Sequence, residues 1–198
     1  MKKAFLFMLL FGPCAWAQNI GEFGRGAREF GVWTSGGHGI SGGFSADTSM
    51  ISTGVRLGWI VFGPHGRGPL RGNFEYAFDV VPVQYLWQPG VNNNTYGGGF
   101  NGAVLKWNFI GKYTPYVEIA GGALFTPKNV PPGINTVNFS PQGSVGFQVP
   151  LGEAKKLDLA IRYVHISNAS LQLPNPGLNF IQGRVGLIFW NGRSGKKK

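Results

Sequence analysis

The sequence predicts an all-β fold, an eight-stranded antiparallel β-barrel of the outer-membrane kind. The first observation is composition. With 33 glycines, 14% aromatic and 13% charged residues among 198, the chain favours short strands joined by tight turns over helices. The second is alternation, because five of the eight strand-like segments show one apolar face and one face with charged, glycine or small residues. The third is a regular change between long and short connections. A low charge fraction is typical of an outer surface that contacts lipid.

The N-terminus predicts export rather than structure. Lys2 and Lys3 precede a short apolar run over residues 4–11, and Ala15-Trp16-Ala17 supplies a small-x-small cleavage site. The apolar run is too short to span a bilayer as a helix. We therefore predict a secretory signal peptide over residues 1–17.

Residues 18–198 are long enough for one domain, with strands over about 28–190 and a basic tail over 191–198. Cys14 is the only cysteine, so disulfides and thiolate metal sites are excluded after cleavage. A lipoprotein signal ending at Cys14 is a second interpretation, which Pro13 disfavours. The net charge of +10 would suit nucleic acid. The signal peptide argues for no nucleic acid and for anionic lipid, including lipopolysaccharide phosphates.

Eight segments with strand character follow one another, an even number as a closed membrane barrel requires. With both termini in the periplasm, the connections after the first, third, fifth and seventh strands lie outside, and these four are the longer ones. The predicted strands are 28–35, 50–62, 71–86, 96–110, 113–126, 137–149, 156–168 and 178–190.

The polar faces of these strands carry a balanced set of charges, which can pair inside a narrow barrel. An Arg or Lys facing the lipid midplane would cost ~2–4 kcal/mol, so these faces are predicted to line the lumen. A soluble barrel would reverse the pattern, with apolar residues inside; a lipocalin-like secreted barrel is the structural alternative. The charges are Arg56, Glu75, Asp79, Lys106, Glu118, Asp158, Arg162 and Arg184.

A His and a Ser stand two residues apart near the end of the seventh predicted strand. Residues i and i+2 share a face, so His165 and Ser167 are neighbours on the apolar, outward side. An imidazole beside a hydroxyl is the minimal unit of nucleophilic catalysis. Asn179 opens the eighth strand on the same face, and a register that pairs residue 165 with 179 places it beside His165. Three polar groups then meet outside the barrel, where lipid acyl esters lie.

The run His165-x-Ser167-Asn168-Ala169, followed by Asn175-Pro176-Gly177, resembles the signature of the lipid A 3-O-deacylase (PagL-like) family, also known as acyloxyacyl hydrolases. The resemblance implies Ser167 as the nucleophile and His165 as the general base. It implies Asn168 as a candidate oxyanion donor, and Asn175 as a residue that shapes the loop or assists there. It implies no metal and no cofactor.

Two positions depart from that family. Its triad has a Glu where this chain has Asn179, which can orient an imidazole through its amide oxygen but cannot stabilise the imidazolium by charge. Ser170 stands where the family often has Gly. Glu118 and Asp158 are predicted to be lumenal and do not replace the missing acid.

The sequence thus predicts an exported, integral outer-membrane esterase. Its triad is Ser167, His165 and Asn179, its substrate is lipid A or lipopolysaccharide, and it removes the 3-O-linked acyl chain. Outer-membrane lipid surrounds it, and a homodimer is compatible with this prediction. The alternative is a non-catalytic barrel, structural or lipid-binding, with a degenerate site. A soluble secreted lipid-binding barrel is a third interpretation.

Overall fold

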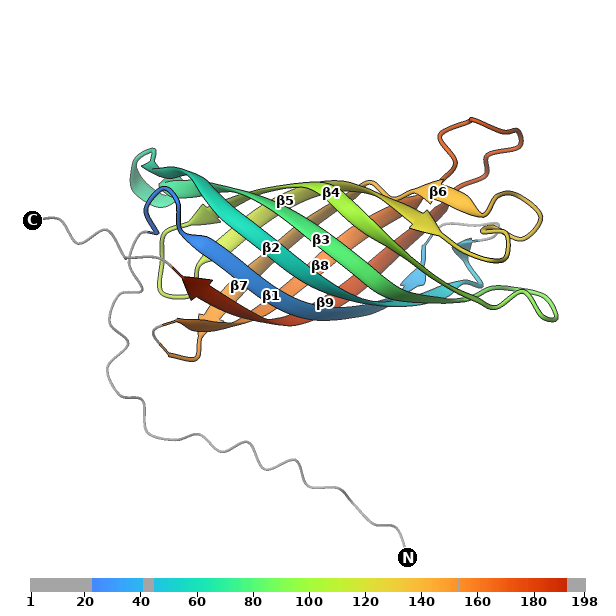
Figure 1. Cartoon of the computed structure of the whole chain (residues 1–198), viewed down its shortest axis with the longest axis horizontal. Helices are drawn as coiled ribbons and strands as arrows, with labels where there is room; N and C mark the ends of the chain where they lie inside the picture. The colour runs from blue at the N-terminus through green and yellow to red at the C-terminus, as the bar shows by residue number, and fades with distance from the viewer. Residues whose placement is uncertain (1–22, 41–44, 153, 192–198) are drawn as a thin grey trace, which may run out of the picture.

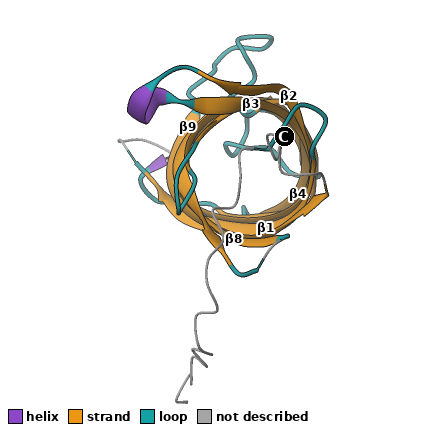
Figure 2. Ribbon diagram, turned by 90° about the vertical axis from the view of Figure 1, so that its left-hand side faces the viewer, coloured by secondary structure: helices purple, strands orange, loops and turns teal. Residues whose placement is uncertain are grey.

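The computed structural model describes residues 23–40, 45–152 and 154–191, which form a closed antiparallel barrel (Figures 1 and 2). The predicted signal peptide and the tail beyond Asn191 lie outside the described residues. Within the described part of the chain, no helix is long and apolar enough to cross a membrane.

Each strand pairs antiparallel with its neighbours, and the pairing of the first strand with the last joins the two ends of the chain's sheet. A 3-10 turn, η2 (Gly68–Leu70), lies in the connection between the second and third strands. The strands are β1 (Arg28–Gly39), β2 (Ser49–His65), β3 (Gly72–Trp87), β4 (Thr95–Phe109), β5 (Pro115–Phe125), β6 (Val137–Phe139), β7 (Gln142–Pro150), β8 (Lys155–Ile166) and β9 (Leu178–Asn191).

β6 and β7 are two parts of one barrel strand, so the barrel has the eight strands that the sequence predicts. Both parts pair with β5, and the ladder is broken between Phe139 and Gln142. The predicted continuous strand over 137–149 is therefore wrong at its middle. Pro141 has no N–H to donate to a ladder, which explains the break. The other predicted strands agree with the structure to within four residues at each end.

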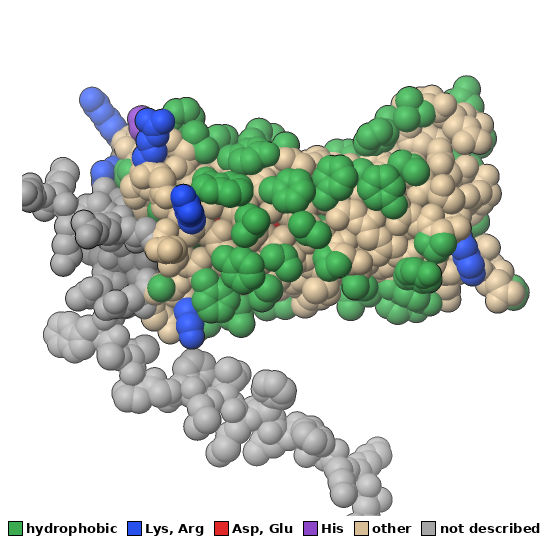
Figure 3. Space-filling model, viewed as in Figure 1, with side chains coloured by type: hydrophobic (Ala, Val, Ile, Leu, Met, Phe, Trp, Pro, Cys, Tyr) green, Lys and Arg blue, Asp and Glu red, His purple; other side chains and the backbone are tan. Residues whose placement is uncertain are grey.

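The outer wall of the barrel is apolar. Alternate residues such as Leu57, Val117, Ile161 and Val185 are exposed there. Figure 3 shows apolar side chains over the wall, with most Lys and Arg at the end where β1 begins and β9 ends. This is the reverse of a soluble barrel and matches a barrel whose wall faces lipid.

The eight charged residues predicted to line the lumen are all buried. Glu29 and Lys156 are buried with them, and the sequence prediction missed both. One is an acid and the other a base, so the balance of charge is kept. Ion pairs connect different strands: Arg56 with Asp79 and Glu118, Arg184 with Glu118 and Asp158, and Lys106 with Glu29 and Glu75.

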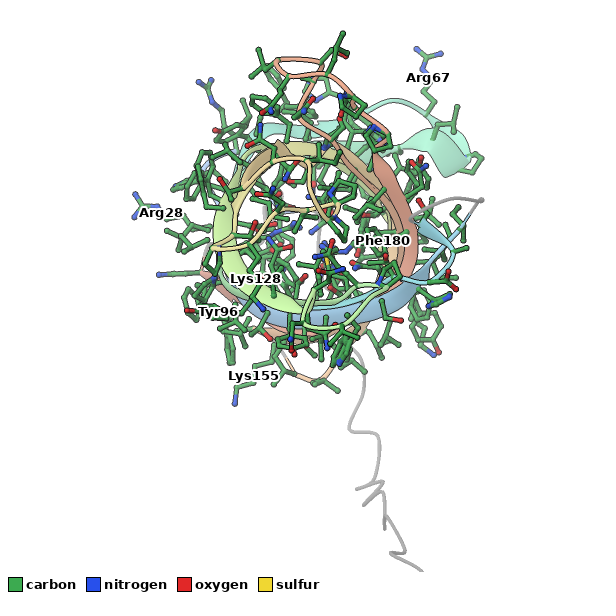
Figure 4. All side chains as sticks on the ribbon, turned by 90° about the vertical axis from the view of Figure 1, so that its right-hand side faces the viewer. Arg28, Arg67, Tyr96, Lys128, Lys155 and Phe180 are labelled. Atoms are coloured by element: carbon green, nitrogen blue, oxygen red, sulfur yellow. The ribbon has the colours of Figure 1, made fainter. Side chains whose placement is uncertain are left out.

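An apolar cluster fills the lumen toward the end with the longer loops. Val164, Ile166, Leu178 and Phe180 belong to it and are almost wholly buried. Figure 4 looks into this end of the barrel and shows Phe180 inside the mouth. A slip of one residue between β8 and β9 would turn these side chains outward, so the cluster fixes the register of the two strands.

Candidate active site

The register of β8 and β9 brings two of the predicted site residues together. His165 pairs with Asn179, as the sequence predicts, and Val164 pairs with the buried Phe180. Because successive residues of a strand point to opposite faces, His165 and Asn179 lie on the outer wall. The Nδ1 atom of His165 is 2.7 Å from the Oδ1 atom of Asn179.

Asn179 is held from several directions. Its Oδ1 atom also accepts a hydrogen bond from the Tyr163 hydroxyl, at 2.5 Å. Its backbone N–H donates to the Ser45 hydroxyl at 3.1 Å, and its carbonyl accepts from the Ile40 N–H at 2.7 Å. Since an amide oxygen only accepts, the hydrogen between the two side chains belongs to Nδ1 of His165. In the neutral imidazole, Nε2 then carries the lone pair that a general base needs.

Ser167 lies just beyond the end of β8 and is fixed by its backbone. Its N–H donates to the Phe139 carbonyl at 3.1 Å, and the Phe139 N–H donates to the Ser167 carbonyl at 2.7 Å. The side chain is buried. Ile166 between them points into the lumen, so His165 and Ser167 both leave the chain on the outer side of the wall. Among the described residues, no hydrogen bond joins the Ser167 hydroxyl to His165, so the structure does not form the dyad contact.

Asn168 organises the loop that follows. Its backbone N–H donates to Oδ1 of Asn175 at 3.1 Å, its Nδ2 donates to the Gln172 carbonyl at 2.8 Å, and its Oδ1 accepts from the Ser170 N–H at 2.9 Å. Asn175 therefore shapes the loop, one of its two predicted roles. An amide NH₂ carries two hydrogens, so Asn168 keeps one donor beyond the bond to Gln172.

The same loop contains two non-glycine residues with left-handed backbone. Ala169 has φ 53° and Ser170 has φ 61°. An L-residue in this region costs about 1–2 kcal/mol, a penalty that glycine avoids. The departure at Ser170 is thus a real local strain, stabilised in part by the bond from Asn175 Nδ2 to the Ser170 hydroxyl at 3.3 Å.

Gly177 approaches the imidazole closely. A Cβ atom at this position would lie 2.8 Å from Cε1 and 3.4 Å from Nε2 of His165. Its φ of +63° also favours glycine. The sequence analysis gives Asn175-Pro176-Gly177 as part of the family signature, and the structure adds that its glycine makes room for the His165 ring.

A second His–Ser pair, which the sequence prediction missed, lies on the neighbouring strands. His38 pairs with Ser49 between β1 and β2, and its Nδ1 atom is 2.8 Å from the Ser49 hydroxyl oxygen. The two residues are far apart in sequence, so only the sheet register reveals them. In this pair Nδ1 faces the serine hydroxyl, whereas Nδ1 of His165 faces the amide of Asn179. Over the described ranges, no group of three or more His, Cys, Asp or Glu side chains is placed to hold a metal ion.

Solved structures that resemble this barrel include two outer-membrane proteins. The outer membrane enzyme PagL covers 79% of this chain and 97% of its own, with a TM-score of 0.56 and 19% identity. The outer membrane protein OprG from Pseudomonas aeruginosa covers 89% of this chain and 100% of its own, with a TM-score of 0.53 and 10% identity. At these identities the similarity shows the fold, an outer-membrane barrel. A comparison with curated proteins finds no match.

The family model described as lipid A 3-O-deacylase (PagL) matches residues 55–187. That range is more than half of the chain and includes His165, Ser167 and Asn179. The matched range contains the short motif over residues 165–177 that carries the sequence resemblance, and it extends over most of the barrel. The chain therefore belongs to the lipid A 3-O-deacylase (PagL) family and is an integral protein of the outer membrane.

Proposed function

We propose that this protein is an esterase that removes the 3-O-linked acyl chain from lipid A, with Ser167 as nucleophile and His165 as general base. The observation that carries the proposal is the contact between His165 Nδ1 and Asn179 Oδ1 on the outer wall. It orients the ring and leaves Nε2 unprotonated at the side of the ring opposite to Asn179. The site lies at the end of the barrel with the longer loops, which is the outer-leaflet end.

The reaction proceeds through an acyl-enzyme. The Ser167 hydroxyl turns toward Nε2 of His165, gives its proton to that nitrogen and attacks the ester carbonyl carbon. The tetrahedral intermediate collapses as the bond to the sugar 3-oxygen breaks, and His165 returns the proton to that oxygen. Water then attacks the acyl-serine, again losing a proton to His165. A free 3-hydroxy fatty acid leaves, and the Ser167 hydroxyl is regenerated.

The imidazolium that forms in each step has only a neutral partner. The amide oxygen of Asn179 offers a dipole in place of a negative charge, so the proton transfer is less favourable than with a carboxylate. Asn168 is the proposed oxyanion donor, through the Nδ2 hydrogen that the Gln172 carbonyl does not use. Because Asn179 is uncharged, we expect a slower enzyme than one with a carboxylate at this position.

The wall below the site suits an acyl chain. An open groove of about 780 Å³ runs along the outer surface and has an almost entirely apolar lining. Tyr163 and Ile181 belong to this lining and also stand next to His165 and Asn179 in the strand register. A chain attached to the scissile ester can therefore lie along the wall without crossing polar surface.

The experiment is mass spectrometry of lipid A after incubation with the refolded mature protein in detergent. We expect the wild type to remove one 3-hydroxyacyl group from lipid A. We expect Ser167→Ala to hydrolyse lipid A at least about 10³-fold more slowly. Ser49→Ala is the matched control, because it removes the serine of the other His–Ser pair, and we expect it to keep full activity.

Two outcomes would contradict the proposal. Full activity of Ser167→Ala, or loss of activity in Ser49→Ala instead, would move the chemistry to another site. No hydrolysis by a folded wild-type barrel would favour the second candidate, a non-catalytic barrel that binds lipid. The observation that favours that candidate is the missing Ser167–His165 hydrogen bond together with the neutral Asn179.

A further inference from the structure

Two hydrogen-bond donors converge on one atom of the site, the Oδ1 atom of Asn179. One is Nδ1 of His165 at 2.7 Å, and the other is the hydroxyl of Tyr163 at 2.5 Å. Tyr163 lies on β8 two residues before His165 and so shares its outward face. Its side chain is 40% exposed on the apolar wall, which places the phenol where few other polar groups can satisfy it.

The orientation of this amide decides the tautomer of His165. A carboxylate presents an acceptor whichever oxygen faces the ring, but an amide has an acceptor end and a donor end. If Asn179 turned its NH₂ toward the ring, Nδ1 would have to accept, and the ring proton would move to Nε2. An imidazole protonated at Nε2 cannot take the proton of Ser167. A site with Asn in place of the acid therefore needs its amide held in one orientation.

The Tyr163 phenol favours the productive orientation. Its hydrogen is bonded only while Oδ1 faces it, because a reversed amide would present a second donor to the phenol oxygen and leave the phenol hydrogen without that acceptor. A hydroxyl hydrogen that loses its acceptor beside apolar side chains, here Ile161 and Ile181 of the same wall, carries a desolvation penalty. The phenol therefore holds the amide oxygen toward both donors.

We propose that Tyr163 is a positioning residue that fixes the amide of Asn179 and, through it, the Nδ1-protonated tautomer of His165. In this chain the pair Tyr163–Asn179 takes the orienting role that the carboxylate has in the family triad. The catalytic consequence rests on the proposed function, whereas the tautomer is a property of the folded barrel alone.

The kinetic test compares four proteins: the wild type, Tyr163→Phe, Asn179→Glu and the double variant. We expect Tyr163→Phe to lower kcat about tenfold with KM changed less than twofold, because ground-state binding of lipid does not use the tautomer. We expect Asn179→Glu to raise kcat about tenfold, since it adds a charge-assisted bond to the imidazolium. In that background the second change, Tyr163→Phe, should alter kcat less than threefold.

The inference depends on how the effect of Tyr163→Phe differs between the wild-type protein and the Asn179→Glu variant. Equal losses with Asn and with Glu at position 179 would make Tyr163 a merely structural residue and overturn the inference, as would no loss in either background. Tyr96→Phe is the matched control, because Tyr96 stands on β4 at the same end of the barrel and is well exposed (Figure 4). It should leave kcat unchanged.

A spectroscopic test separates this inference from the proposed function. The ¹⁵N chemical shifts of His165, assigned by comparison with His165→Gln in the histidine-labelled barrel, report which ring nitrogen carries the proton. We expect Nδ1–H in the wild type and a substantial fraction of Nε2–H in Tyr163→Phe. An unchanged Nδ1–H tautomer in Tyr163→Phe would overturn the inference. This test does not need catalysis, so it decides the inference even if the wild type is inactive. An inactive wild type would contradict the proposed function and not this inference.

Discussion

The lumen holds most of its charged side chains in ion pairs, whereas the site on the outer wall is built from an imidazole, an amide and a phenol. In the lumen, Arg56 contacts both Asp79 and Glu118. At the site, the hydrogen bonds around His165 join an imidazole, an amide and a phenol. A charged side chain inside the closed barrel can form an ion pair that offsets its desolvation penalty. On the outer wall a charged side chain faces lipid, and its desolvation penalty is not offset.

This difference gives a physical reason for the amide at position 179. An Asn on the wall avoids the burial of a carboxylate against lipid, at the cost of weaker support for the imidazolium. The lumen has no such choice, because removing one member of a pair leaves the other buried without compensation. We therefore expect substitutions in the lumen to change mainly stability, and substitutions at the site to change mainly activity.

The largest expected effect comes from breaking the lumenal network. Arg56→Met removes bonds to two carboxylates at once and should lower the free energy of unfolding by about 3–5 kcal/mol. Urea unfolding in detergent micelles measures it. Arg67→Met is the control, since Arg67 is exposed beside η2, and it should change stability by less than about 0.5 kcal/mol. Equal midpoints for the two variants would show that the network does not hold the barrel together.

A medium effect is expected where the site is tightly packed but uncharged. Gly177→Ala places a Cβ 2.8 Å from the His165 ring and forces an L-residue to φ +63°. Activity should fall about tenfold or more through displacement of the ring, with a stability loss of only about 1 kcal/mol. Gly183, on β9 a few residues after Gly177, has open space around it and no left-handed backbone, so Gly183→Ala is the matched control. It should change neither activity nor stability. A large loss of either in Gly183→Ala would contradict the explanation that Gly177→Ala acts through packing against the His165 ring.

The smallest expected effect concerns the support behind Asn179. Ser45→Ala deletes the hydroxyl that accepts the Asn179 N–H at 3.1 Å. One neutral hydrogen bond is worth about 1 kcal/mol, so we expect a decrease in unfolding free energy of that size. Hydrolysis of lipid A should change less than about fivefold, because the backbone of Asn179 is also held by Ile40. A loss as large as that of Ser167→Ala would mean that this contact positions the triad.

Much of this molecule follows from its sequence, because a strand has a period of two and lipid rejects charge. Alternation placed Arg56, Lys106 and Glu118 in the lumen, and the same rule placed His165 on the outer wall. The sequence places Asn179 beside His165 only for the register that pairs residues 165 and 179, and the structure has that register. The roles of the site residues remain predictions, which the kinetic experiments test.

What only the tertiary structure decided depends on contacts between residues distant in sequence, or on space. The lumenal places of Glu29 and Lys156 and the pair His38–Ser49 depend on where the strands begin and on the register between them. The bond from Tyr163 to Asn179 and the closeness of Gly177 to His165 require atomic positions. Sequence periodicity fixes which face a side chain takes, but hydrogen bonds and close packing depend on how neighbouring strands are staggered, and that is set only when the barrel closes.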